Sequence, residues 1–275
     1  MSSTSDLPRL YALLGDPVHH SRSPALHQAA FTALGLPHRY FALRVPPERL
    51  GAALIGARAL GLAGLNLTIP HKQAALPHLD DLSPSAARIG AVNTVILRGD
   101  RLYGDNTDSP GFAAALGQLR ARTPSAAIVL GAGGAARAVV DALLHQVGVD
   151  QLRWVSRAGV PPPHDPRIRA LTYPQLAAGP LAADLLVHCT SVGMAGGPAE
   201  LPIPLDLTTM PAGAAVLDLV YPRPPGGLLD RAEARGLAVQ DGLETLLWQA
   251  VYAQERWQGR PLPAPVIEAM RAALR

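Results

Sequence analysis

The sequence contains very little cysteine, and this shortage excludes several classes of protein. Cys189 is the only cysteine among 275 residues, so neither an intrachain disulfide nor a cluster of thiolate metal ligands can form. The single cysteine fits a reducing compartment, and we expect the protein to work in the cytoplasm. We also expect no metal site.

Long apolar runs and clustered charges are also lacking. No segment approaches the roughly 20 apolar residues that cross a bilayer. The opening "MSSTSDLPRL" has no basic stretch followed by an apolar run, so we expect no export signal. The net charge is only +3 and the arginines are scattered, which argues against nucleic-acid binding and is compatible with a small anionic substrate. Both a monomer and a homodimer remain open.

Lysine is the third shortage. Of the 24 lysine and arginine residues, Lys72 alone is lysine. Arginine stays charged, whereas burial and neighbouring charges can bring a lysine into the range of proton transfer. Solvent exposure is the usual alternative for a lysine, but its uniqueness in an arginine-rich chain favours a chemical role for Lys72.

Hydrophobic residues make up 48% of the chain, enough for one large or two medium domains. From "RLYALLG" to "LAGLNLTIP", short apolar runs alternate with helix-like segments, which predicts βα units around a largely parallel sheet. Apolar residues at helical spacing between Pro24 and Gly35 predict the first helix. The segment "AVNTVILRGDRLYGDNTD" predicts two strands about a Gly-Asp turn, followed by a helix over 110–119.

A second α/β unit is predicted after the polar linker "RARTPS". It begins with the strand "AAIVLGAGG" and the helix "AARAVVDALLHQVG", and further strands follow in "LRWVSR", "DLLVHCT", "AAVLDLVY" and "LAVQD". We place the boundary near residues 109–120 and interpret the proline-rich "AGVPPPHDPR" as a loop. A long helix is predicted over "DGLETLLWQAVYAQERWQG".

The run "GAGGAA" lies between the first strand and helix of this second unit. It fits the G-x-G-x-x-G/A turn of dinucleotide-binding folds, in which a bare backbone lets a pyrophosphate approach the helix N-terminus. The alternative is a turn that only packs the strand against the helix. The residues predicted to bind the cofactor here are Gly131, Ala132, Gly133, Gly134, Ala135 and Ala136.

The next predicted strand ends in "VSRAG". NAD sites usually place an acid here for the ribose diol, whereas an arginine accommodates a 2′-phosphate. Ser156 and Arg157, with no acid beside them, favour NADP over NAD. The alternative for Arg157 is a solvated surface arginine.

Polar residues gather near the ends of the predicted strands in the first half. Ser21 and Ser23 are two apart in a segment interpreted as extended, so both hydroxyls would face the same way and suit a carboxylate or a polyhydroxylated ligand. The alternative for Ser23 is a cap on the following helix.

Three further segments contribute polar groups. Asn66 and Thr68 share one face of "LNLTIPHK", Asn93 lies in "GAVNTV", and "GDNTD" ends at Asp108. The alternatives are a strand former for Thr68, a turn residue for Asn93 and a helix N-cap for Asp108. Together the clusters predict a binding site, with Lys72 in the first turn of a helix and near a carboxylate.

The motifs "SRSP", "NLTIPHK", "AVNT", "GDNTD", "GAGGAA" and "DGLETLLWQA" together resemble the shikimate dehydrogenase family in order and spacing over nearly the whole chain. The resemblance implies an α/β enzyme with a substrate-binding domain over 1–108, completed by C-terminal helices over 243–275. It also implies a Rossmann-type NADP-binding domain over 109–242 and an active site in the cleft between the domains. The implied reaction is the NADPH-dependent reduction of 3-dehydroshikimate to shikimate, a late step toward chorismate and the aromatic amino acids.

The resemblance also implies roles for individual residues. Lys72 and Asp108 match the catalytic pair, with Lys72 acting as acid and base at the C3 oxygen. Ser156 and Arg157 match the loop that binds the adenosine phosphate. The positions that match substrate-binding residues are Ser21, Ser23, Thr68, Asn93 and Gln249. The positions near the nicotinamide and the substrate are Leu219, Tyr221 and Gly242, of which Tyr221 is assigned to the substrate.

Several positions depart from the family pattern. His71 replaces an aromatic residue before the lysine, where a charged imidazole would act on its neighbour. Thr245 stands where a methionine often lines the nicotinamide pocket, and His188 and Cys189 stand where small or amide residues are common. Two alternatives stay open, an NAD-linked quinate/shikimate dehydrogenase and a non-catalytic shikimate-binding sensor. The Ser-to-Thr change and the acid expected for quinate or NAD are both absent.

Overall fold

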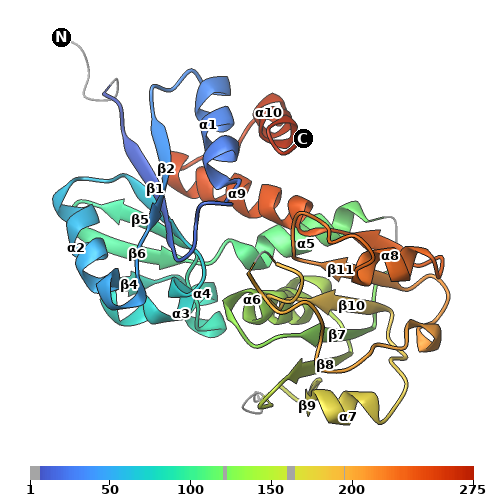
Figure 1. Cartoon of the computed structure of the whole chain (residues 1–275). Helices are drawn as coiled ribbons and strands as arrows, with labels where there is room; N and C mark the ends of the chain where they lie inside the picture. Colours follow the sequence, from blue (N-terminus) through green and yellow to red (C-terminus); the bar gives the residue numbers. More distant parts are fainter. Residues whose placement is uncertain (1–6, 120–122, 160–164, 195) are drawn as a thin grey trace. The chain divides into compact units, whose positions relative to one another are not determined.

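The computed structural model describes residues 7–119, 123–159, 165–194 and 196–275. The chain divides into two compact units: the first comprises the chain up to Gly111 together with Leu246–Arg275, and the second comprises Phe112–Thr245. Each unit contains a six-stranded sheet (Figure 1). The end of the chain therefore returns to the unit formed by its beginning.

The first sheet has the strand order β2-β1-β3-β5-β6-β4. Its strands are β1 (Leu10–Gly15), β2 (Arg39–Arg44), β3 (Gly64–Leu67), β4 (Asp81–Leu82), β5 (Thr94–Arg98) and β6 (Arg101–Asp105). β1 pairs in parallel with β2 and β3, whereas β5 is antiparallel to β3 and β6. The predicted parallel strands and the hairpin are confirmed. The sequence analysis does not identify β4, because two residues are too few to form a pattern.

Helices cover both faces of this sheet. They are α1 (Ser23–Ala33), α2 (Leu50–Ala59), the short α3 (His71–Ala74) and α4 (Pro84–Ile89), and the C-terminal α9 (Gly242–Gln258) and α10 (Ala264–Ala272). Alternate residues of β1 serve the two faces: Leu14 packs with Leu54 of α2, and Tyr11 packs with Phe31 of α1 and Trp257 of α9. The predicted limits of the first helix are confirmed, since Gly35 follows its end with a φ of +68°.

The second sheet is entirely parallel, in the order β12-β11-β10-β7-β8-β9. Its strands are β7 (Ala126–Leu130), β8 (Gln151–Ser156), β9 (Ile168–Thr172), β10 (Leu185–His188), β11 (Ala215–Asp218) and β12 (Ala238–Gln240). The chain builds outward from β7 to β9, then crosses over and builds outward again from β10 to β12. Between β7 and β10 lies the topological switch point, where ligands bind beside the carboxyl ends of the strands.

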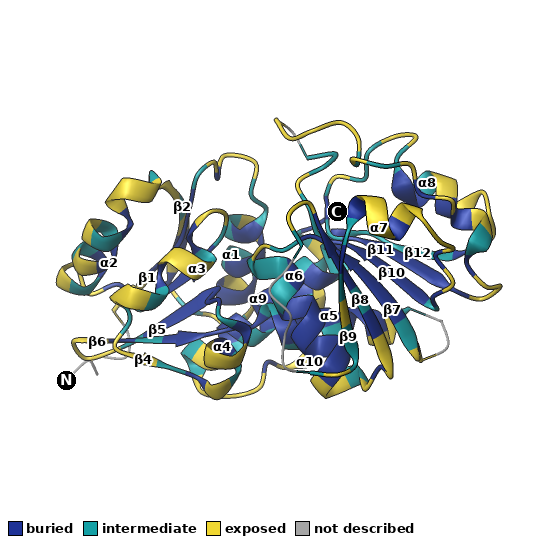
Figure 2. Cartoon of the chain, turned by 90° about the horizontal axis from the view of Figure 1, so that it is seen from below, coloured by how far each residue is buried: buried dark blue, intermediate teal, exposed yellow. Residues whose placement is uncertain are grey.

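Two hydrophobic clusters sandwich this sheet. Val139 of α6 (Gly134–Ala142) and Phe112 of α5 (Asp108–Gln118) pack in one cluster, and Leu176 of α7 (Tyr173–Ala177) and Leu229 of α8 (Leu228–Glu233) pack in the other. In Figure 2 the strands of both sheets are largely buried and the outward faces of the helices are exposed. This is the expected α/β layering.

The sequence analysis identifies all strands of the second sheet except β9, and it does not identify α7 or α8. β9 follows the proline-rich loop and has no regular alternation of polar and apolar residues, and both helices are too short to give a clear periodicity. Residues 160–164 of that predicted loop, and residues 120–122 of the predicted linker, lie outside the described residues. Between the elements lie short 3₁₀ turns and one π-helical turn: η2 (Pro47–Arg49), η3 (Leu76–His78), η5 (Leu207–Thr209) and η4 (Leu143–Val147).

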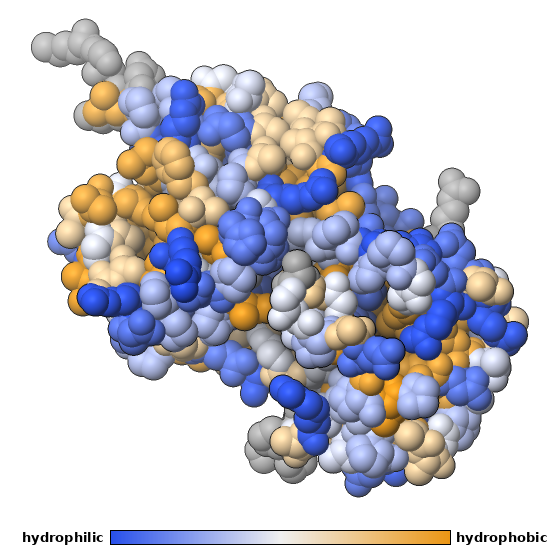
Figure 3. Space-filling view, viewed as in Figure 1, coloured by the Kyte–Doolittle hydropathy of each residue, from blue (hydrophilic) through white to orange (hydrophobic). Residues whose placement is uncertain are grey.

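Large apolar side chains reach the surface of the first unit at several points. Those with the greatest exposure include Leu7, Phe41, Ile55, Leu60 and Ile69. Figure 3 shows apolar groups interspersed with charged ones on the face it presents. Phe41 is exposed because β2 is an edge strand of its sheet. Among the described helices, none is long and apolar enough to cross a membrane.

Candidate active site

Lys72 and Asp108 form an ion pair in the first unit. Lys72 Nζ lies 2.5 Å from Asp108 Oδ2, and the two side chains retain only 16% and 13% of their exposure. Lys72 is the second residue of α3, shortly after β3, and Asp108 is the first residue of α5, shortly after β6. The structure thus places the lysine in a first helical turn beside a carboxylate, as the sequence predicts.

Asn93 fixes the orientation of Asp108. Its amide nitrogen donates to Asp108 Oδ1 at 2.8 Å and to Thr107 Oγ1 at 3.0 Å, while its oxygen accepts from the backbone N–H of Thr107 at 2.7 Å. Asn93 is 2% exposed, so these bonds are not weakened by competing water. Both oxygens of Asp108 are therefore engaged, one by a cation and one by an amide.

Asn66 supports Asn93 from the neighbouring strand. Its amide nitrogen donates to the Asn93 carbonyl at 3.0 Å and to Thr94 Oγ1 at 3.1 Å, and its oxygen accepts from the Tyr40 hydroxyl at 2.8 Å. The hydrogen bonds therefore run without a break from a core tyrosine to the lysine. Such a fully satisfied network restricts each side chain to one orientation.

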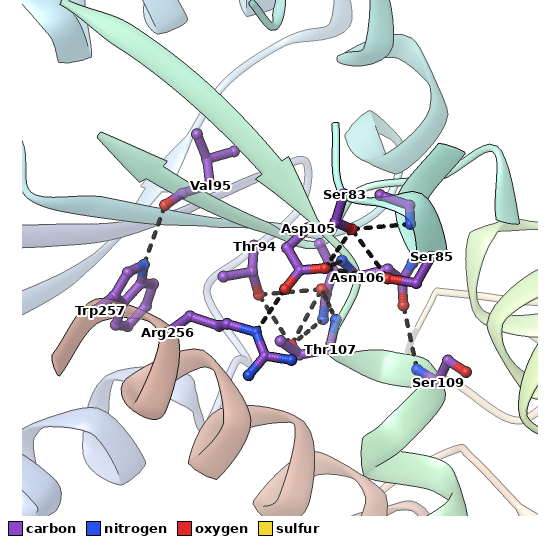
Figure 4. A network of polar contacts seen from close by, with 12 residues as sticks. Ser83, Ser85, Thr94, Val95, Asp105, Asn106, Thr107, Ser109, Arg256 and Trp257 are labelled. Atoms are coloured by element: carbon purple, nitrogen blue, oxygen red, sulfur yellow. Dashed lines mark hydrogen bonds and ion pairs between the residues drawn. The ribbon is translucent and has the colours of Figure 1, made fainter. Parts of the chain in front are cut away.

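Asp105 anchors the segment that carries Asp108 (Figure 4). Its carboxylate accepts from Ser83 Oγ at 2.6 Å, from the Asn106 backbone N–H at 2.8 Å and from Arg256 Nε at 2.7 Å. Burial alone would raise the pKa of Asp105, but the bonds from Ser83, Arg256 and the Asn106 backbone outweigh burial, and the pKa is lowered. Asp105 therefore stays ionised as a buried anchor.

The helix α9 is tied to the first sheet at the same place. Arg256 pairs with Asp105, and Trp257 Nε1 donates to the Val95 carbonyl at 3.1 Å (Figure 4). Gly111 lets α5 approach α9, since a Cβ there would lie 2.7 Å from the Gln249 backbone nitrogen. This placement lets Gln249 Oε1 accept from Asn93 Nδ2 at 3.3 Å.

The two serines of "SRSP" differ from the prediction. Arg22 has helical dihedrals and α1 begins at Ser23, so the segment is not extended and its hydroxyls do not alternate as in a strand. The Ser23 side chain does not cap the helix either; instead, Ser21 Oγ accepts from the Ser23 backbone N–H at 3.2 Å. No hydrogen bond among the described residues links either serine to Lys72 or Asp108. Thr68 lies between β3 and α3, and its carbonyl accepts from the His71 backbone N–H.

His71 lies in the interior of the first unit. Its side chain is fully buried, and its Nε2–H donates to the Val45 carbonyl at 2.8 Å. The ring therefore points away from solvent into the protein and has no hydrogen bond to Lys72 within the described part of the chain. The expectation that a charged imidazole acts on the lysine finds no support in these contacts.

The glycine-rich turn in the second unit has the features of an anion site. Gly131 adopts a φ of +123°, and a Cβ there would lie 2.9 Å from the Cys189 carbonyl oxygen, so only glycine fits. A Cβ on Gly133 would meet no atom within 4 Å, and α6 starts at Gly134 without a side-chain cap. The first backbone N–H groups of α6 are thus available to a phosphate.

Further residues assigned to the cofactor lie at strand ends of the same sheet. Ser156 is the last residue of β8, and its hydroxyl is buried without a hydrogen-bond partner among the described residues. Arg157 follows it and is exposed. An unsatisfied hydroxyl beside an exposed guanidinium, with no carboxylate between them, fits a phosphorylated ribose better than a ribose diol.

The remaining assigned positions surround the end of β11. Leu219 follows this strand, and its backbone N–H donates to the His188 carbonyl at 3.0 Å. Gly242 begins α9 where a Cβ would clash with the Leu219 carbonyl oxygen, so the two segments touch through bare backbone. Tyr221 is half-buried two residues further on, and Thr245 is buried with its hydroxyl unpartnered among the described residues.

Comparison with known proteins identifies the family. Residues 13–95 match the family model of the shikimate dehydrogenase substrate binding domain. The chain is 41% identical over 287 residues to the shikimate dehydrogenase (NADP(+)) of Symbiobacterium thermophilum, covering 98% of this chain and 95% of that protein. The chain belongs to the shikimate dehydrogenase family.

Two solved structures have the same fold as this chain. The shikimate 5-dehydrogenase of Thermus thermophilus, in complex with NADP(H) and shikimate, superposes with a TM-score of 0.79 at 41% identity, covering 96% of this chain and 99% of that one. The ligand-free 5-ketofructose reductase of Gluconobacter superposes with a TM-score of 0.77 at 31% identity, covering 97% and 99%. The mixed α/β prediction with a Rossmann-type domain is confirmed.

This shikimate dehydrogenase family member also contains polar groups that the sequence analysis does not assign. Asp105 and Arg256 tie α9 to the segment before Asp108, and Asp218 pairs with His188. His188 and Asp218 each end a strand of the second sheet. The rule applied to the first half, that polar residues at strand ends form sites, would have identified this second pair as well.

Proposed function

We propose that this chain is an NADP-dependent shikimate dehydrogenase, which reversibly reduces 3-dehydroshikimate to shikimate. The observation that carries the proposal is the Lys72–Asp108 pair, held by Asn93 in a chain of this family. The proposed role is a late step toward chorismate and the aromatic amino acids. The lone cysteine supports a cytoplasmic location.

Lys72 is the proposed acid and base. NADPH, if held by the second unit, would supply the hydride for the C3 carbonyl carbon, and the Lys72 ammonium would donate the proton to the C3 oxygen. In the reverse direction neutral Lys72 accepts the hydroxyl proton. Asp108 holds the Nζ atom at 2.5 Å, and Asn93 keeps the carboxylate from rotating. The pair therefore presents one mobile proton in a fixed place.

The substrate is proposed to bind around this pair. Ser21 and Ser23 would hold the carboxylate, as the family resemblance implies. The residues proposed for the ring hydroxyls are Thr68, Asn93, Gln249 and Tyr221. Asn93 and Gln249 are bonded to each other at 3.3 Å, the longest bond of the network, so a hydroxyl can exchange with this contact at small cost.

The second unit is proposed to bind NADP. The loop Gly131–Ala136 would receive the pyrophosphate on backbone N–H groups, and Ser156 and Arg157 would bind the 2′-phosphate. Leu219 and Gly242 would lie near the nicotinamide. The uncapped start of α6 and the unsatisfied Ser156 hydroxyl support this assignment.

One assay tests the proposal. Formation of reduced nicotinamide is followed by absorbance, with shikimate and quinate each offered NADP and NAD, and with 5-ketofructose offered to the reduced cofactors. We expect the highest kcat/KM for shikimate with NADP. Higher kcat/KM values with quinate and NAD would favour a quinate/shikimate dehydrogenase. Turnover of 5-ketofructose alone would identify a 5-ketofructose reductase. Shikimate binding without any turnover would identify a sensor.

A further inference from the structure

Asp218, His188 and Thr190 form a buried hydrogen-bonded chain in the second unit. His188 Nδ1 lies 2.8 Å from Asp218 Oδ1, and His188 Nε2 lies 2.5 Å from Thr190 Oγ1. The His188 and Asp218 side chains are only 3% and 4% exposed. The preceding three residues of both strands are apolar, so these two polar residues are exceptions placed where β10 and β11 end.

The hydrogen-bond donors and acceptors of Asp218, His188 and Thr190 are consistent with one arrangement of protons. Asp218 Oδ1 also accepts from the Val220 backbone N–H at 3.0 Å, and Thr190 Oγ1 accepts from the Val192 backbone N–H at 3.1 Å. With the proton on His188 Nδ1, the ring donates to Asp218 and accepts from the Thr190 hydroxyl. One imidazole thus joins the segment after β11 to the turn after β10.

Of the two joined segments, the Thr190 turn borders the topological switch point, and the Leu219 segment follows the neighbouring strand β11. A Cβ on Gly131 would lie 2.9 Å from the Cys189 carbonyl oxygen and 3.4 Å from Thr190 Cγ2, so Thr190 lies against the first glycine of the cofactor turn. Cys189 donates its N–H to the Leu130 carbonyl, which fixes the turn to β7. The Thr190 turn therefore forms the β10 side of the crevice, opposite the glycine-rich side.

We propose that the Asp218–His188–Thr190 chain positions the dinucleotide by holding the Thr190 turn, which borders the switch point, to the segment that follows β11. His188 is a positioning residue in this assignment, because it acts through Thr190 and Asp218. The assignment rests on the proposed NADP-dependent function. It explains why a family member carries a buried histidine at the end of a strand that is otherwise apolar.

Two conservative variants break one link each. In His188→Asn the shorter amide can still donate to Asp218 but cannot reach Thr190, so the buried carboxylate keeps its partner. Thr190→Val keeps the volume and removes the hydroxyl. We measure the dissociation constant of NADP⁺ for each variant and for the double variant by titration calorimetry. Each single change is expected to weaken NADP⁺ binding roughly three- to tenfold, the value of one or two hydrogen bonds.

The double variant separates positioning from direct contact. If His188 acts through Thr190, the double variant should bind NADP⁺ no more weakly than the weaker-binding single variant. Either single change already interrupts the same series of hydrogen bonds. An unchanged dissociation constant for His188→Asn overturns the proposal, and so do fully additive effects. A lowered melting temperature with unchanged NADP⁺ binding would show a role in stability only, and also overturns it.

The chain offers a matched control. His145 lies 3.9 Å from Asp141 near the end of α6, and its side chain is 43% exposed. His145→Asn should leave NADP⁺ binding unchanged. None of the variants should change the binding of shikimate to the free protein. If the wild-type chain binds shikimate but no NADP⁺, the proposed function fails, and that result is distinct from equal NADP⁺ binding by wild type and His188→Asn.

Discussion

At the scale of single residues, the polar groups of the candidate site are held in place by hydrogen bonds and ion pairs. Asp108 has both oxygens engaged and Asn93 is saturated with partners, so Lys72 is the group of this network with a proton to exchange. The arginines of the chain cannot take this role, because a guanidinium keeps its proton. The chemistry therefore depends on one side chain.

Replacing Lys72 tests this dependence. Lys72→Met keeps the length of the side chain and removes its charge, so turnover should fall by roughly 10²- to 10⁴-fold, the contribution of general acid-base catalysis. Shikimate binding, measured by calorimetry, should change far less, because the other polar groups remain. Turnover near the wild-type value would contradict the proposed mechanism.

The single lysine allows a second test without mutation. Lys72 is the only lysine in the sequence, so an amine-directed acylating reagent can modify only this side chain and the terminal amine. We expect modification to abolish activity in proportion to the acylated Lys72 found by peptide mass spectrometry. Shikimate present during the reaction should protect both. Loss of activity without modified Lys72 would point to another group.

Arg157 offers a residue-level test of cofactor preference. Arg157→Glu replaces an exposed cation at the end of β8 by an anion. The KM for NADP(H) should rise by roughly tenfold or more, since a charge-assisted hydrogen bond is lost, while the KM for NAD(H) should stay level or fall. The exposed Arg235 provides the control: Arg235→Glu should change neither value. Equal NADP(H) constants for wild type and Arg157→Glu would reassign Arg157 to the solvated surface.

At the scale of elements, α9 is important because its contacts with the first sheet place Gln249 beside Asn93. Arg256 and Trp257 tie its end to the first sheet, and Gln249, two turns earlier, then meets Asn93. The Arg256–Asp105 pair thus fixes the helix that carries Gln249 and the segment that carries Asp108. A contact remote from Lys72 holds two sides of the site together.

Arg256→Leu tests this attachment. The change removes the cation from a buried carboxylate that keeps its bonds from Ser83 and Asn106, and because Arg256 is partly exposed we expect a loss of roughly 1 kcal/mol in unfolding free energy. The KM for shikimate should rise several-fold through the displaced Gln249. Arg256→Lys should recover most of the shikimate affinity. A stability loss with unchanged shikimate KM would limit the pair to a structural role.

The helices and strands that the sequence predicts are those whose apolar residues follow a regular spacing over many positions. The helix from Pro24 to Gly35, the hairpin about the Gly-Asp turn and the first strand and helix of the second unit all have periodicities that local physics fixes. The extended interpretation of Ser21 to Ser23 fails because helical dihedrals already begin at Arg22, ahead of the residues between Pro24 and Gly35. β9, α7 and α8 are short, and tertiary packing rather than local pattern decides them.

At the scale of the whole molecule, motif order identifies the family, but contacts between distant segments do not follow from the sequence. No spacing rule connects Arg256 to Asp105, which are 151 residues apart along the chain and meet only because α9 packs on the first sheet. The same is true of His27, which stacks on Tyr40 with ring centroids 4.2 Å apart and lies beside Gln254 of α9. Such contacts determine how stability responds to pH.

His27 should make the folded state sensitive to mild acid. Burial lowers the pKa of His27 to about 3, whereas an unfolded histidine titrates near ~6.5. Below that value the unfolded chain binds a proton that the folded chain refuses. The stabilisation is therefore complete above about pH 6.5 and is lost as the pH falls toward 3, at up to about 1.4 kcal/mol per pH unit.

The slope of stability against pH measures this effect. Urea unfolding between about pH 4.5 and 7.5 should show a shallower fall for His27→Phe than for the wild type, because the variant has no proton to bind there. The comparison uses slopes, so any constant destabilisation from the lost bond to Gln254 cancels. Asp105, whose pKa is lowered, contributes only near and below the range of an ordinary carboxyl and leaves this window unaffected. Parallel curves for the two proteins would mean that His27 takes up its proton in the folded state, and that the aromatic core around it admits water.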